Sequence, residues 1–329
     1  MESNLNKVQS RREFLGKSVT VLTAASFIPS LFSCASKSEP VSVESVSGIG
    51  QVNSNFGGVQ IGAITYSWRS MPGGLENVID YCREANISSI ELMSGDLETY
   101  LGAPQFNPGQ ETKKDQYKKD IKEWRLALDM AKVEAARKCL DEAGIKVHIV
   151  KFSPSRLSDE EIDYAFKTAK VMGAKAITDE INMESAKRLA PFAEKHGMYI
   201  AFHNHMQYAE EGFSCDPILA VSPAVMLNFD AGHFYGSTGI HPNEMIKKYH
   251  DRIYSIHLKD KTGPTVEDQP NANQVWGQGE MPIADVLLLI KQEKWPIYCD
   301  IELEYDIKPW SNSVKEVATC VKYAKEILM

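Results

Sequence analysis

The sequence has few cysteines and no arrangement of them that builds a covalent or metal site. Six cysteines are spread over 329 residues, and no Cys-x-x-Cys pair occurs. Apart from Cys34, which is considered below, five remain, an odd number at irregular spacings. This pattern indicates neither a disulfide framework nor a cysteine-based zinc site, and it predicts buried free thiols.

The sequence also lacks the signatures of chains that bind nucleic acid or nucleotide phosphates. The formal net charge is −8, and no stripe of lysine and arginine is interleaved with aromatic residues. Nucleic acid would on average be repelled, so no nucleic-acid partner is expected. The segment TYSWRSMPGG (65–74) has no Gly-x-Gly-x-x-Gly or Gly-Lys-Ser/Thr spacing. A doubly wound open sheet with a phosphate loop is therefore not indicated.

The first 57 residues have the composition of a targeting segment and a linker. Residues 10–16 resemble a twin-arginine export signal, and residues 19–32 add an apolar stretch that is too short to span a bilayer comfortably. The four residues that end at Cys34 resemble a lipoprotein processing box. We predict an export signal over 1–33, lipidation of Cys34 and a flexible tether over 34–57, and hence a periplasmic, membrane-anchored lipoprotein. The alternative is an ordinary cleaved signal with an incidental cysteine.

From residue 58 onward, short apolar runs alternate with amphipathic stretches. The runs predict strands, and the stretches predict helices that Ser158 is suited to begin and Gly144 and Gly197 to end. Eight strands alternating with helices over 58–329 predict one catalytic domain of the α/β class, a (β/α)8 TIM barrel. The predicted strands are 59–68, 87–93, 145–152, 174–178, 199–205, 225–230, 253–259 and 297–304; the predicted helices are 77–84, 124–143, 154–172, 185–196, 241–250, 282–293 and 313–328.

Residue types that bind divalent metals stand at the ends of the last four predicted strands. They are His203 and His205, Asp230 and His233, His257, and Glu302. Each alone has a structural explanation, such as a hydrogen-bonded core histidine or an aspartate in a turn. Together, without a cation, they would leave uncompensated buried charge, which is costly. Two imidazoles and two carboxylates can enclose one ion and leave positions open for a substrate.

Five short motifs connect the sequence to a known family. They are HNH (203–205), DAGH (230–233), IHLKD (256–260), WGQGE (276–280) and IELE (301–304). On these motifs, the chain from about residue 59 to its C-terminus resembles the sugar phosphate isomerase/epimerase family. That family belongs to the xylose isomerase-like TIM barrels, which also include ketose 3-epimerases, inosose dehydratases and endonuclease IV.

The resemblance implies one divalent metal ion at the mouth of the barrel. One ligand would come from each of the last four strands: His203, Asp230, His257 and Glu302. Whether His203 or His205 is the ligand stays open at this point, and His233 is implied as a second ligand or a substrate contact. The segment 277–279 would close the mouth on the substrate side. The donor set suits manganese, cobalt, zinc or iron better than calcium.

One position departs from the ketose epimerases. Those enzymes place a glutamate on the fifth strand, where it works with a glutamate of the eighth strand on the opposite face of the sugar. Here His203 takes that place, and an imidazole bound to a metal has no free lone pair to act as a base. The HNH variant resembles inosose dehydratase and lyases or hydratases of 3-keto sugars. We expect a metal-dependent lyase, hydratase or isomerase that acts on a keto sugar, 3-keto glycoside or inosose through a metal-stabilised enediolate.

Several further residues are candidates for catalysis and substrate binding. Besides the ligand Glu302, the catalytic candidates are His233, Glu304 and Glu180 as the base, and His205 and His148 as the acid that protonates the leaving oxygen. The candidates for contacts with a carbohydrate are Tyr66, Trp68, Trp276, Lys151 and Glu304. The aromatic residues either stack on a sugar ring or only line the rim, and Lys151 either binds an anionic group or is a solvated charge.

Three other functions compete with this interpretation. A ketose epimerase or isomerase of the same family is the nearest alternative. A nuclease of the endonuclease IV type would need an Asp-x-His element after the seventh strand, but residues 259–277 contain no histidine. A non-catalytic sugar-binding lipoprotein is compatible with the same ligand set. Barrels of this kind often pair through the loops near the mouth, so a homodimer is a further expectation.

Overall fold

The computed structural model describes residues 51–106, 109 and 113–329. The predicted export signal, Cys34 and the first part of the predicted tether lie outside these residues, so they stay predictions. Within the described ranges, no helix combines the length and the hydropathy needed to cross a bilayer.

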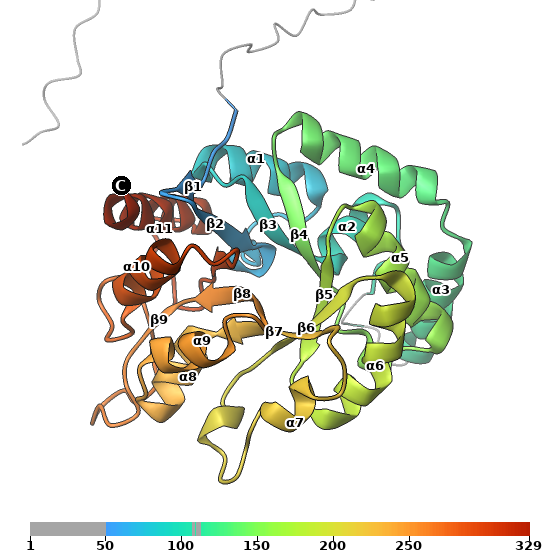
Figure 1. Ribbon diagram of the computed structural model, residues 1–329. Coiled ribbons are helices and arrows are strands. Elements are labelled where there is room, and N and C mark those ends of the chain that lie inside the picture. Colours follow the sequence, from blue (N-terminus) through green and yellow to red (C-terminus); the bar gives the residue numbers. More distant parts are fainter. Residues whose placement is uncertain (1–50, 107–108, 110–112) are drawn as a thin grey trace, which may run out of the picture. The chain divides into compact units, whose positions relative to one another are not determined.

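Eight parallel strands close into a barrel, which confirms the predicted fold class (Figure 1). Their order is β2-β11-β8-β7-β6-β5-β4-β3, and β2 also pairs with β3. Because all eight run in one direction, their carboxyl ends meet at one mouth, where the active sites of such barrels lie. The strands are β2 (Val59–Ile64), β3 (Ser89–Met93), β4 (Lys146–Lys151), β5 (Ala176–Glu180), β6 (Tyr199–His203), β7 (Val225–Asp230), β8 (Ile253–Leu258) and β11 (Tyr298–Ile301).

Helices surround the barrel on its outside (Figure 1). Two predicted caps are confirmed: Ser158 forms a capping box with Glu161, and Gly197 ends a helix with a φ of 62°. The helices are α1 (Leu75–Ala85), α2 (Ser94–Tyr100), α3 (Lys114–Ala127), α4 (Met130–Glu142), α5 (Asp159–Val171), α6 (Met183–His196), α7 (Asp216–Leu219), α8 (Ala231–Thr238), α9 (Pro242–Tyr249), α10 (Ile283–Glu293) and α11 (Ser313–Leu328).

Two of the predicted helices differ from those observed. The predicted helix 124–143 is broken, because Leu128 is extended and the Asp129 carboxylate accepts a hydrogen bond from the Ala131 N–H at 3.0 Å. An aspartate that caps a new helix cannot at the same time continue the preceding one, so α3 ends and α4 begins here. The predicted helix 154–172 starts with a separate 3-10 turn, and its α-helical part begins only after Ser158.

The predicted tether, residues 34–57, includes residues that belong to the folded domain. Residues Asn55–Phe56 form the short strand β1, which pairs antiparallel with β2. The side chains of Val52 and Phe56 are buried in the main core, and the Ser54 hydroxyl donates to the Ile61 carbonyl at 2.6 Å. These residues belong to the folded domain because β2 and the main core supply their partners, which the composition of residues 34–57 could not reveal.

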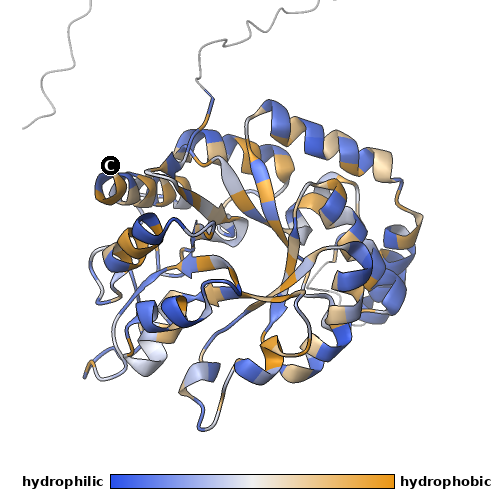
Figure 2. Cartoon of the chain, viewed as in Figure 1, coloured by the Kyte–Doolittle hydropathy of each residue, from blue (hydrophilic) through white to orange (hydrophobic). Residues whose placement is uncertain are grey.

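Apolar residues fill the layer between the strands and the helices. Figure 2 shows many hydrophobic residues along the strands, while the helices carry hydrophilic residues on their outward sides. The inside of the barrel differs, because it contains buried polar groups in several strands. They include Glu91, His148, Asn228, Ser255 and Asp300, each at most 3% exposed. Several of them are paired with one another: His148 contacts Asp300 at 2.8 Å, and the Asn228 amide donates to Glu91 at 2.8 Å.

Candidate metal centre

The four predicted ligands lie at adjacent strand ends. His203 is the last residue of β6, Asp230 is the last of β7, and His257 is the last but one of β8. The parallel register places Asp230 directly beside His257. Glu302 follows the last residue of β11, and its N–H donates to the Leu258 carbonyl at 3.0 Å. The pairing of the strands, and not a local motif, therefore brings these side chains to one point of the mouth.

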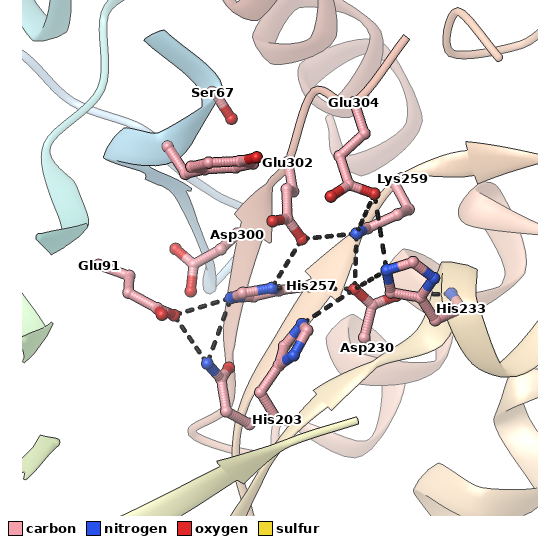
Figure 3. A network of polar contacts seen from close by, with 12 residues as sticks. Ser67, Glu91, His203, Asp230, His233, His257, Lys259, Asp300, Glu302 and Glu304 are labelled. Atoms are coloured by element: carbon pink, nitrogen blue, oxygen red, sulfur yellow. Dashed lines mark hydrogen bonds and ion pairs between the residues drawn. The ribbon is translucent and has the colours of Figure 1, made fainter. Parts of the chain in front are cut away.

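The side chains of these four residues converge as predicted (Figure 3). One donor atom from each lies within 4.8 Å of the other three, and all four residues are buried. The His203 Nε2 atom is 3.2 Å from Asp230 Oδ2, and the His257 Nδ1 atom is 2.9 Å from Glu302 Oε2. Two ligands on one ion at bond lengths near 2.1 Å stand roughly 3.0–3.5 Å apart. The donor types and their spacing therefore fit one divalent ion of the first transition series.

Lys259 is the cation nearest to this cluster, and the sequence did not single it out. Its Nζ atom lies 2.9 Å from Asp230 Oδ2, 2.8 Å from Glu302 Oε2 and 2.8 Å from Glu304 Oε2. Burial would lower the pKa of Lys259, but the three carboxylates raise it above its ordinary value. Gly232 of α8 makes room for this lysine, because a Cβ atom there would collide with the Lys259 side chain. Lys259 therefore stays charged and neutralises part of the ligand set.

The Nε2 atom of His257 faces the carboxylate of Glu91, which lies 166 residues earlier in the sequence. The Nε2 atom of His257 is 2.7 Å from Glu91 Oε2, and the Asn228 amide donates to the same oxygen at 2.8 Å. Burial alone would lower the pKa of His257, but the carboxylates of Glu91 and Glu302 raise it well above its ordinary value. Burial likewise opposes ionisation of Glu91, and the charge of His257 outweighs it, so that the pKa of Glu91 is lowered.

Glu180 joins the two histidines of the HNH motif. Its Oε2 atom is 3.5 Å from His203 Nδ1 and 3.0 Å from His205 Nδ1. His203 thus turns Nε2 toward Asp230, while His205 lies beyond the end of β6 with about half of its side chain exposed. This arrangement makes His203 the better candidate for the ligand. Hydrogen bonding to Glu180 raises the pKa of His205, which favours a protonated imidazole at the mouth.

His233 and Glu304 face the cluster from the other side (Figure 3). The two side chains lie 3.5 Å apart, between His233 Nε2 and Glu304 Oε2. Among the described residues, neither ring nitrogen of His233 has a hydrogen-bond partner. Burial lowers the pKa of His233 to about 4, and the nearby Lys259 charge acts in the same direction. His233 is therefore a neutral imidazole with an available lone pair.

The structure places other predicted residues away from this group. Both ring nitrogens of His148 are occupied, by Ser89 Oγ at 2.9 Å and by Asp300 Oδ2 at 2.8 Å, inside the barrel. The Trp68 ring is 3% exposed and packs on Tyr81, and the Trp276 ring is 7% exposed and packs on Tyr323. The two tryptophans therefore offer almost no free face for a sugar ring.

Of two further predicted substrate contacts, Tyr66 is accessible and Lys151 is largely buried. Tyr66 is 38% exposed beneath the guanidinium of Arg69, in a cavity of about 500 Å³ that follows β2. The Lys151 Nζ atom lies 3.4 Å from Glu180 Oε1, within the carboxylates of the mouth. Burial would lower the pKa of Lys151, and Glu91 and Glu180 raise it. Lys151 is thus a partner of the acidic cluster and not a fully solvated charge.

Several curated relatives match part of the chain. An inosose dehydratase of Clostridium perfringens is 27% identical over 161 residues, which are 44% of this chain and 52% of that protein. An inosose dehydratase of Clostridium botulinum is 31% identical over 137 residues, which are 36% of this chain and 45% of that protein. The chain spans about half the length of the curated relatives it matches.

Solved structures share the fold over most of the chain. They include a probable 3-DHS dehydratase of Bacillus anthracis (TM-score 0.56, 12% identity, 80% of this chain and 98% of that one) and a D-psicose 3-epimerase of Clostridium cellulolyticum (0.57, 10%, 82% and 99%). The IOLI protein, whose crystal structure contains a zinc atom, has a TM-score of 0.54 at 15% identity, over 82% of this chain and 98% of that one. At these identities, the likeness shows the fold alone. A family model described as the xylose isomerase-like TIM barrel matches residues 79–324, and with the observed eight-stranded barrel this means that the chain belongs to that family.

Proposed function

We propose that the protein is a metal-dependent dehydratase of a keto sugar or a related cyclic ketone such as an inosose. The observation that carries this proposal is the convergence of His203, Asp230, His257 and Glu302 on one point of the barrel mouth. When bound there, a divalent ion would act as a Lewis acid on a ketone oxygen and increase the acidity of the neighbouring C–H group.

Two histidines near the ligands supply the base and the acid of the proposed reaction. His233 has an available lone pair and takes the proton from the carbon next to the ketone, with Glu304 beside it to stabilise the imidazolium that forms. His205, whose pKa is raised by Glu180, donates its proton to the hydroxyl that leaves as water. One C–H bond and one C–O bond break, and a C=C bond forms between the two carbons. Lys259 holds Glu304 and Glu302 in place during this exchange.

The comparisons support this class of reaction. The curated relatives are named inosose dehydratases, and one of the similar structures is named a probable dehydratase. His203 at the end of β6 argues against a reaction that needs a free carboxylate base on that strand. The ligand set is compatible with manganese, cobalt, zinc or iron. The particular cyclic ketone is identified by a substrate panel.

A panel of substrates tests the proposed reaction. Protein loaded with each metal in turn is incubated with an inosose, 3-keto glucosides and simple ketoses, and enone formation is followed by ultraviolet absorbance. We expect dehydration of at least one cyclic ketone by the wild type, and no turnover by Glu302→Gln, which should lose the metal. A substrate that only changes its configuration would instead favour an epimerase. The absence of both products, and of solvent deuterium in the recovered ketones, would leave a sugar-binding protein and contradict the proposal.

A further inference from the structure

Each ligand histidine has a carboxylate on the ring nitrogen that faces away from the cluster. For His203, that carboxylate is Glu180, at 3.5 Å from Nδ1 and shared with His205. For His257 it is Glu91, at 2.7 Å from Nε2. The Glu91 contact is shorter and wholly buried, so it constrains its histidine more strongly than Glu180 does.

Glu91 is held in one orientation by the strands around it. It lies in the middle of β3, and its Oε2 atom receives the Asn228 amide of β7 as well as facing His257 of β8. Its other oxygen, Oε1, has no hydrogen-bond partner among the described residues. The carboxylate therefore directs one oxygen, and only one, at the imidazole of His257.

Two groups lie at Nε2 of His257: the Glu91 carboxylate at 2.7 Å, which accepts from an N–H, and the Asn228 amide nitrogen at 3.2 Å, which already donates to Glu91. The shorter contact with the charged carboxylate favours hydrogen on Nε2, and this determines which nitrogen of His257 can bind an ion. A neutral imidazole has one N–H and one lone pair, and an N–H directed at a carboxylate fixes the lone pair on the other nitrogen. Here that other nitrogen is Nδ1, which lies 2.9 Å from Glu302 Oε2 and 3.9 Å from Asp230 Oδ2. Carboxylates in this position orient metal-binding histidines and make them stronger ligands.

We propose that Glu91 is a positioning residue of the metal centre, which keeps hydrogen on Nε2 of His257 and so presents Nδ1 to the ion, and that Asn228 holds Glu91 in this role. The inference rests on the metal site of the proposed function and not on the substrate or the reaction. It extends the centre by two residues. Glu91 comes from β3, which provides none of the four ligands, and Asn228 comes from β7, which also provides Asp230.

Two substitutions separate the hydrogen bond from the charge. Glu91→Gln can keep its amide oxygen at the Oε2 position, and its NH2 group then takes the place of the unpartnered Oε1 atom. Glu91→Leu removes the acceptor and leaves the imidazole without a partner on Nε2. Glu161→Gln is the matched control, because Glu161 is a buried glutamate of α5 whose contacts are with Ser158 and Arg125, away from the cluster.

The experiment measures zinc affinity by competition with a chelator, and the state of His257 by ¹⁵N NMR of the zinc-loaded protein. The His257 signal is assigned by its loss in His257→Gln. We expect zinc on Nδ1 and hydrogen on Nε2 in the wild type and in Glu91→Gln. Glu91→Leu should lose about 10- to 100-fold in affinity, with Glu91→Gln between it and the wild type and Glu161→Gln unchanged.

Three results would overturn the proposal. They are zinc on Nε2 of His257 in the wild type, wild-type affinity in Glu91→Leu, and an affinity of Glu91→Gln as low as that of Glu91→Leu. If Glu91→Leu does not fold, the NMR spectra of the wild type and Glu91→Gln decide the question. None of these measurements requires turnover, so a failure here is distinct from a failure to find a substrate.

Discussion

Replacing Lys259 by methionine should destabilise the metal-free protein strongly. The ammonium group lies within 2.9 Å of three carboxylates, and its side chain is only 3% exposed. Removing one partner of a buried ion pair costs about 3–5 kcal/mol, because the other charge stays buried without compensation. Here Asp230 and Glu302 would remain in a water-excluded site. For a domain of this size, a loss of that order lowers the Tm by on the order of 10 °C.

A divalent ion should rescue much of this loss. The ion would compensate Asp230 and Glu302, so only the contact of Lys259 with Glu304 stays missing in the loaded variant. We therefore expect metal to raise the Tm of Lys259→Met by more than it raises the Tm of the wild type. Thermal unfolding by circular dichroism, with chelator and with excess metal, measures the two differences.

A surface lysine provides the control for this prediction. Lys195 forms an exposed pair with Asp163 at 2.6 Å, and exposed pairs contribute little to stability. Lys195→Met should therefore leave the Tm almost unchanged with and without metal. The reasoning is refuted if Lys259→Met unfolds at the wild-type temperature in chelator, or if metal raises the Tm of both proteins equally.

Further predictions concern pH, catalysis and anchoring. The pKa of His257 is raised, so binding of an ion must displace a proton below that pKa, and metal affinity should rise about tenfold per pH unit, with proton release seen by calorimetry in two buffers. A pH-independent affinity from pH 6 to pH 8 would contradict this. His205→Gln should lower kcat about 10²- to 10⁴-fold without weakening metal binding, and a loss of metal instead would remove His205 from the acid role. Glu180→Gln should lower the pKa of His205 and shift the basic limb of the kcat–pH profile to lower pH; an unmoved limb would argue against this assignment. Cys34→Ala should abolish incorporation of labelled palmitate and move the protein from the membrane fraction to the soluble periplasm, and an unchanged distribution would argue for another means of retention.

The four candidate ligands could be picked out in the sequence because they stand at the ends of apolar runs. Asp230 follows VMLNF, His257 lies in IYSIHL, and Glu302 lies in IELE, and parallel strands bring such positions to one mouth. The closure of the barrel followed from the same alternation of patterns, as did seven predicted helices, of which 124–143 and 154–172 differ from those observed. The α-helix at 231–238 was missed because its glycines, Gly232 and Gly236, are poor helix formers.

The residues that support the ligands were harder to find. Glu91 interrupts the apolar run ISSIELM in the same way as Glu302, but it lies 166 residues from His257, and only the register of the closed barrel joins them. The sequence analysis assigned no role to Lys259, which follows the seventh predicted strand. The signal that it is buried lies in another segment, where Gly232 leaves the space that its side chain fills. Such signals need the tertiary structure before they can be read.

The most direct test of the account is a crystal structure of the metal-loaded protein, with anomalous scattering measured at the absorption edge of the metal. We expect one ion per chain, bound by His203 Nε2, Asp230, His257 Nδ1 and Glu302, with Glu91 hydrogen-bonded to His257 Nε2. An ion held instead by Glu180, His203 and His205, or no anomalous peak at the mouth of the barrel, would contradict it.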